Sequence, residues 1–265
     1  MSHYTVGIFT TNQPTDDMIG EILAPYCEGD GRQTDANPYF EAYDATEEYM
    51  NRYLTESVKK CKTPDGKLYY PWEIKKQDDV INDYEEVNVP LVNLYATFED
   101  FMREHMGYEL NEDGRYIYYS NPNAKWDWYQ IGGRWDSELL AKLEKDETAQ
   151  LWVNSYPVKY IDFEEMRKRR LEDLTPYHDA VYDGFLNPEY MLKRYPTEEE
   201  YIRSNTQFIT YAVVTPDREW LEPGAMGWFG ISAATIDAER EWDNSYPEFL
   251  EKYKHCWLTI VDCHI

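Results

Sequence analysis

Basic residues are scarce in this chain: 26 lysines and arginines stand against 51 aspartates and glutamates, and the formal net charge is −25. A field of that sign repels the nucleic-acid backbone, so we expect no general DNA or RNA binding. No segment approaches the roughly 18 to 20 apolar residues that a membrane helix requires. The four cysteines show no CxxC spacing, and we see no signal peptide. This pattern predicts a soluble, cytoplasmic protein with reduced thiols and no membrane partner.

Standard catalytic and metal-binding motifs are also missing. The chain has no Walker, Rossmann or serine-nucleophile motif, which argues against NTPases, dehydrogenases and α/β-hydrolases. His105, His178 and His255 lack the partner histidines, at i+2 or i+4, of a metal site. We therefore predict no cofactor and no metal, although a carboxylate-rich magnesium site stays open in so acidic a chain.

Aromatic residues are abundant, at 16% of the chain, and three tryptophans fall between Asn121 and Trp135 in the segment NPNAKWDWYQIGGRW. In one interpretation this segment plugs a core, and its indole N–H groups bond to Asp127 or to the backbone. In the other, its rings stack on a ligand while Arg134 grips a phosphate or carboxylate and the glycines offer backbone donors. A helix expected over residues 136–147 would place the glycine turn near a helix N-terminus, which favours anions. The candidate ligand-binding residues are Trp126, Asp127, Trp128, Tyr129, Gly132, Gly133, Arg134 and Trp135.

Both ends of the chain read as strands, at residues 3–11 and 256–264, because β-branched and aromatic residues dominate them. We predict an α+β fold with a single antiparallel or mixed sheet, of which a ferredoxin-like core is one form, and with the first and last strands adjacent. Residues 1–265 would form a single domain, with large helical insertions between about residues 25 and 200 that carry the aromatic segment. Further helices are expected at 46–60, 97–106, 163–174, from 197 onward and at 245–254 with Pro247 in its first turn, and further strands at 116–119, 151–161 and 207–215.

The adjacent terminal strands would bring His3 near His264. His3 and Thr5 share one strand face, which resembles the His-x-Thr motifs of two-histidine phosphoesterases, enzymes that cleave phosphodiesters without a metal. The second motif is missing, because His264 is followed only by Ile265. His3, Thr5 and His264 are therefore candidate catalytic residues if the protein is an enzyme, and structural histidines otherwise. Cys263 alternates onto the opposite face.

Three segments together resemble a family of uncharacterised proteins of bacteriophages and mobile elements. They are the start SHYTV, the central WDWYQIGGRW and the ending VDCHI. The chain departs from the pattern at Phe229, where a second tryptophan is expected, and in the segment GIFT that begins at Gly7. The resemblance implies a phage context, hence the host cytoplasm, and a shared fold more than it implies a reaction.

Three hypotheses follow for the function. In the first, the protein binds and sequesters a small nucleotide-derived immune signal of the host, of the cyclic nucleotide or cyclic ADP-ribose type. In the second, it cleaves such a signal as a metal-independent phosphodiesterase. In the third, it is an acidic DNA mimic that inhibits a host protein. A homo-oligomer is compatible with all three.

Overall fold

The computed structural model describes residues 2–29, 37–74, 83–143, 146–227 and 231–265. The contacts divide the chain into two units, where a single domain with insertions was expected. Unit 1 comprises Met1–Asp30 and Asn123–Ile265, and unit 2 comprises Gly31–Pro122. Unit 2 is thus an insertion into unit 1, shorter than the expected insertion of about residues 25 to 200.

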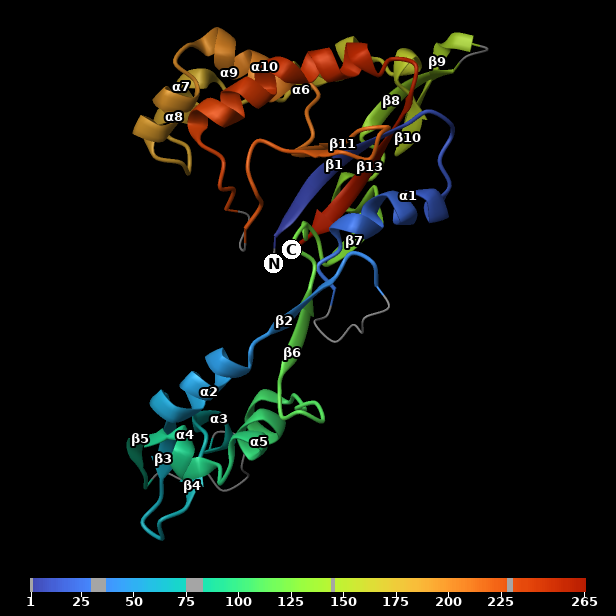
Figure 1. Ribbon diagram of the computed structural model, residues 1–265. Helices are drawn as coiled ribbons and strands as arrows, with labels where there is room; N and C mark the ends of the chain where they lie inside the picture. Colours follow the sequence, from blue (N-terminus) through green and yellow to red (C-terminus); the bar gives the residue numbers. More distant parts are fainter. Residues whose placement is uncertain (1, 30–36, 75–82, 144–145, 228–230) are drawn as a thin grey trace. The chain divides into compact units, whose positions relative to one another are not determined.

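Unit 1 is built on a mixed sheet in which the first and last strands are neighbours, as predicted (Figure 1). The two strands pair antiparallel over their whole length, from His3 opposite His264 to Thr10 opposite Trp257. The α+β class is therefore confirmed. The strands of this sheet are β1 (His3–Thr10), β7 (Trp128–Ile131), β10 (Ser155–Pro157), β11 (Ala212–Val214), β12 (Trp220–Leu221) and β13 (Trp257–His264), in the order β10-β13-β1-β11-β12 with β7 also paired to β13.

Strand alternation gives this sheet two apolar faces, and helices pack on both. Val6, Ile8 and Val261 contact α1 (Asp16–Leu23) in one core cluster. Phe9, Leu258 and Ile260 point the other way and pack with Tyr246 of α10 (Ile236–Lys252). The predicted helix at 245–254 is thus only the end of a longer one, and Pro247 lies inside it rather than in its first turn.

The predicted helix over residues 136–147 is wrong. Its leucines lie instead on β8 (Leu139–Leu143), which forms a hairpin with β9 (Asp146–Val153). Leu139, Leu140 and Ala141 are all buried in succession, as in a strand covered on both faces. A short run of leucines fits both the helical period of 3.6 residues and a buried strand, so it does not distinguish a helix from a strand. The other helices of unit 1 are α6 (Phe163–Glu172), α7 (Tyr177–Tyr182), α8 (Pro188–Arg194) and α9 (Glu198–Thr206), with 3-10 turns at Ala24–Tyr26, Gly133–Trp135 and Val158–Tyr160.

Unit 1 closes on itself where unit 2 is inserted. The backbone N–H of Lys125 donates to the carbonyl of Tyr26 at 2.8 Å, and that of Glu28 donates to the carbonyl of Trp126 at 2.7 Å. Cys27 and Trp126 form a parallel β-bridge. The two chain segments that lead into and out of unit 2 are therefore joined within unit 1.

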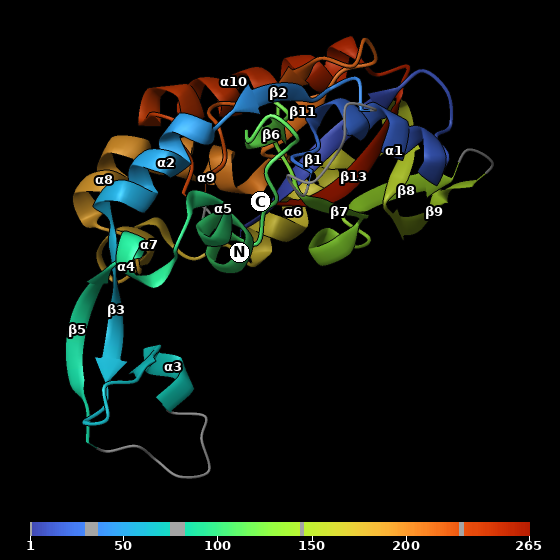
Figure 2. The same ribbon diagram turned by 60° about the horizontal axis from the view of Figure 1, so that its bottom comes forward.

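Unit 2 has its own core of Tyr53, Leu91, Phe101, Met102 and Tyr116, among others. Its three-stranded sheet has β3 (Ser57–Lys62) in the centre, and Figure 2 shows β3 and β5 (Glu85–Pro90) side by side. None of the helices that the structure describes, in either unit, is long and apolar enough to cross a membrane. The elements of unit 2 are β2 (Glu41–Asp44), α2 (Thr46–Thr55), β3 (Ser57–Lys62), β4 (Leu68–Tyr69), α3 (Pro71–Ile74), β5 (Glu85–Pro90), α4 (Leu91–Leu94), α5 (Phe98–Asp100), a π-helix (Phe101–Met106) and β6 (Ile117–Ser120).

Candidate functional site

The pairing of β1 with β13 brings two histidines together at one end of the sheet. His3 and His264 are direct partners in the register, so their side chains leave the same face. Their ring centroids are 4.9 Å apart with an interplanar angle of 70°. The predicted convergence of the two histidines is confirmed, and we call this surface the histidine face.

Each of the two imidazoles is held by a carboxylate. Nδ1 of His3 lies 2.8 Å from Oδ1 of Asp262, and Nδ1 of His264 lies 2.5 Å from Oδ1 of Asp127. A carboxylate accepts the proton of Nδ1, which fixes the tautomer and leaves Nε2 of a neutral ring free to accept a proton. In both histidines the carboxylate therefore occupies Nδ1 and leaves Nε2 as the other ring nitrogen.

The two carboxylates differ in their surroundings. The Asp262 side chain is only 2% exposed, whereas that of Asp127 is 40% exposed. The second oxygen of Asp262 accepts a hydrogen bond from the backbone N–H of Arg134 at 3.0 Å. Asp262 is thus fixed at both oxygens, as a buried charge requires.

The paired glycines let the turn approach this carboxylate closely. Gly133 has φ +54°, and a Cβ built on it would lie 2.4 Å from Cβ of Asp262. Gly132 has φ +72°, and a Cβ there would lie 2.5 Å from the Asn154 amide nitrogen. The glycines therefore bring the backbone of the turn against Asp262 and Asn154.

The aromatic segment is divided between two environments. Trp126 is 7% exposed, its Nε1 donates to the carbonyl of Leu23 at 3.1 Å, and it packs edge to face on Tyr129. These two rings lie in the core beneath α1. Trp128 pairs with His264 across β7 and β13, is 48% exposed, and has its ring centroid 6.1 Å from that of His3. Of these three rings, Trp128 is the one on the histidine face.

The remaining predicted site residues divide in the same way. Trp135 packs against the core on the α10 side of the sheet. Arg134 is exposed, and none of the ion pairs found among the described residues uses its guanidinium. Thr5 shares the face of His3, but its hydroxyl oxygen accepts the backbone N–H of Tyr211 at 3.1 Å. Within the described part of the chain, Arg134 is thus a cation without an ion-pair partner, on the turn that holds Asp262.

One atom of the histidine face lacks a partner. Nε2 of His264 is buried and forms no hydrogen bond, which holds for no other buried side-chain nitrogen or oxygen in the described part of the chain. Leaving such a group unsatisfied costs about 1–3 kcal/mol. A buried polar group without a partner calls for an explanation, and a catalytic role is one of those known in proteins.

Cys263, next to these residues in sequence, lies on the other side of the sheet. It is fully buried in the α1 cluster, and burial raises the pKa of its thiol well above the usual value. A neutral, enclosed thiol is a poor nucleophile. The prediction that Cys263 faces away from His264 is confirmed.

Two further groups of residues attract attention in unit 1. A cavity of about 650 Å³ lies against α6 and is lined by Arg169 and Arg170, among others. Both arginines already have partners, because Arg169 pairs with Glu165 and Arg170 pairs with Glu138. The cavity therefore offers no free cation to a ligand.

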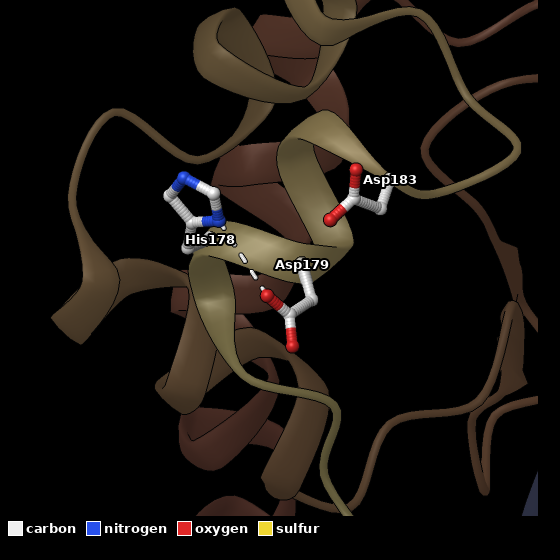
Figure 3. A group of neighbouring side chains, drawn as sticks. All are labelled: His178, Asp179 and Asp183. Atoms are coloured by element: carbon white, nitrogen blue, oxygen red, sulfur yellow. Dashed lines mark ion pairs between the residues drawn. The ribbon is translucent and has the colours of Figure 1, made fainter.

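The second group is formed by His178, Asp179 and Asp183 at α7, and Figure 3 shows the ion pair between the first two. All three side chains are exposed. Exposed acidic clusters of this kind are ordinarily solvated surfaces.

Unit 2 contains a polar cluster of its own. The hydroxyls of Tyr70 and Tyr95 and the Nδ1 of His105 lie 3.1 to 3.3 Å from one another. Burial, with Arg52 and Lys60 nearby, lowers the pKa of His105 from its ordinary value. The three groups provide hydrogen-bond partners for one another, so this cluster needs no ligand to account for it.

Comparison of the chain with family models, with curated proteins and with solved structures finds no match. The function is therefore argued from the histidine face.

Proposed function

We propose that this protein cleaves a phosphodiester bond in a small nucleotide-derived molecule, with His3 and His264 as its acid and base. The observation that carries the proposal is the pair of carboxylate-held imidazoles, whose ring centroids lie 4.9 Å apart. Proton transfer by one positioned side chain accelerates a reaction by about 10²- to 10⁴-fold. Two such groups allow one oxygen to lose a proton while another gains one.

Charge favours a small phosphorylated substrate over a polymer. The Arg134 guanidinium is exposed and available for a phosphate, and guanidinium matches phosphate geometry. The net charge of −25 opposes a long polyanion, which would have to lie along the acidic surface. A molecule with one or two phosphates is small enough to interact mainly with the charges next to the site.

The exposed Trp128 supplies a ring next to this acid–base pair. An aromatic side chain can stack on a nucleobase or another flat ring. In the phage context that the sequence resemblance implies, a molecule of this kind would be a host immune signal. Cleavage uses both histidines as acid and base, whereas sequestration requires neither of them to transfer a proton.

The test is product analysis with matched histidine variants. The protein is incubated with a panel of cyclic mononucleotides, cyclic dinucleotides and cyclic ADP-ribose, then denatured by heat, and the supernatant is separated by chromatography. We expect a new product from the unchanged protein and a loss of rate of at least about 10²-fold in His3→Gln and in His264→Gln. His255→Gln, at an exposed histidine outside the site, is the control and should keep the full rate.

Two outcomes would overturn the proposal. Recovery of intact ligand after heating would mean sequestration without cleavage. If no compound binds and salt-sensitive capture of a basic protein is found instead, the acidic-inhibitor hypothesis would replace both ligand hypotheses.

A further inference from the structure

The histidine face provides an acid and a base, but none of its described side chains is placed to attack phosphorus. Cys263 lies on the opposite side of the sheet. The Thr5 oxygen already accepts the N–H of Tyr211, and both oxygens of Asp262 are engaged by His3 and Arg134. Asp127 is held at Nδ1 of His264.

Both carboxylates also lie on the wrong side of their rings to act as nucleophiles. Each contacts Nδ1, whereas the proton-transferring atom is Nε2. A substrate oxygen bonded to Nε2 is therefore separated from the carboxylate by the imidazole itself. Attack by either carboxylate would also remove the group that fixes the ring.

We infer that the substrate brings its own nucleophile, a ribose 2′-hydroxyl next to a 3′-phosphodiester. This inference rests on the proposed function and names its substrate class. A vicinal hydroxyl is already held close to phosphorus, and well-oriented intramolecular reactions gain effective concentrations of about 10⁵–10⁸ M. Such a hydroxyl needs only a base, whereas a water molecule also needs groups that hold it in place.

The reaction step balances with the two imidazoles alone. One neutral Nε2 takes the proton of the 2′-hydroxyl as O2′ bonds to phosphorus. The bond from phosphorus to the leaving 5′-oxygen breaks, and that oxygen takes a proton from the other, protonated Nε2. The products are a 2′,3′-cyclic phosphate and a free 5′-hydroxyl, and no water is consumed.

The position of the rings suits the reset of this step. After the step the two histidines have exchanged protonation states, so one proton must pass from one to the other. The ring centroids are 4.9 Å apart, so the proton has only a short distance to cover. The enzyme thus returns to its starting state without a further residue.

The inference is tested with two versions of a 3′,5′-linked cyclic dinucleotide, one with ribose and one with fluorine in place of each 2′-hydroxyl. The reactions run in H₂¹⁸O, and mass spectrometry identifies the products. We expect the ribose compound to open to a linear product with a 2′,3′-cyclic phosphate that contains no ¹⁸O. The fluorinated compound should bind and remain intact.

The possible results separate the inference from the function on which it rests. Cleavage of the fluorinated compound, or ¹⁸O in the first product, would overturn the inference and leave phosphodiester cleavage standing. If neither this ribose compound nor any other compound of the panel is cleaved, the proposed function fails and the inference fails with it. Trp128→Ala should raise KM for the ribose compound more than it lowers kcat, because the ring binds a base and transfers no proton.

Discussion

Gly133→Ala is the smallest change that should disturb the histidine face without touching a histidine. The added methyl would lie 2.4 Å from Cβ of Asp262 and 2.5 Å from its Oδ2. Asp262 is buried, and its two oxygens are held by His3 and by the backbone N–H of Arg134. The turn or the carboxylate must therefore move.

The cost has two parts. A residue with a side chain at φ +54° loses about 1–2 kcal/mol relative to glycine. Forcing a methyl into a packed site adds about 1–3 kcal/mol. We expect Gly133→Ala to lower the free energy of unfolding of unit 1 by about 2–5 kcal/mol.

Denaturant unfolding measures this loss, and Gly114→Ala is the matched control. Gly114 has φ +72°, and a Cβ there would meet nothing within 4 Å, so its replacement costs only the backbone part. Since Gly114 lies in unit 2, its effect is measured on the unfolding of that unit. If the two variants lose equal free energy, the contact between Gly133 and Asp262 does not restrict the turn, and the reasoning is wrong.

Three further predictions concern the fold. Asp243→Asn should destabilise unit 1 by about 2 kcal/mol in denaturant unfolding, because the buried guanidinium of Arg194 loses the carboxylate 2.5 Å away and keeps only Glu239 at 2.9 Å; a loss below about 0.5 kcal/mol would refute this. Trp126→Phe should cost about 1–3 kcal/mol in the same assay by orphaning a buried carbonyl, whereas Trp128→Phe, at an exposed ring, should stay within about 0.5 kcal/mol. Because the pKa of His105 is lowered in the folded protein, the unfolded chain binds more protons than the folded one. The contribution of His105 to stability is therefore present above its ordinary pKa of 6.5 and is lost as the pH falls through the folded pKa. The midpoint temperature of thermal unfolding of unit 2 should therefore fall more steeply with acidification in the unchanged protein than in His105→Gln. Parallel pH profiles of this temperature would contradict the prediction.

The sequence predicted the terminal strands and their pairing because both carry long runs of β-branched and aromatic residues. From that pairing came the convergence of His3 and His264, which depends only on strand register. The partners of the histidines were not foreseen. Asp262 shares a strand face with His264, yet it bonds to His3 across the strand pair, and sequence alone does not say which neighbour a side chain leans toward.

The aromatic segment shows why sequence alone does not tell which residues of a motif face a site and which lie in the core. Trp126, Trp128 and Trp135 look alike in the sequence, but only Trp128 lies on β7 and is brought next to His264 by the pairing with β13, whereas Trp126 lies in the core at α1 and Trp135 on the 3-10 turn. Asp127 was expected to meet a ligand or an indole N–H and instead holds His264. The assignment would have required the knowledge that residues 128–131 form a strand and that this strand pairs with the last strand of the chain.

The closure of unit 1 at the point of insertion leaves unit 2 free to change during evolution. Lys125 and Trp126 meet Tyr26 and Glu28 directly, so unit 1 is closed by backbone hydrogen bonds of its own. To that scaffold the insertion is a loop, and each doubling of a loop's length costs only about 0.6 kcal/mol. Relatives could therefore exchange, shorten or lose the inserted unit while unit 1 keeps its fold, so that one scaffold could carry different inserted modules.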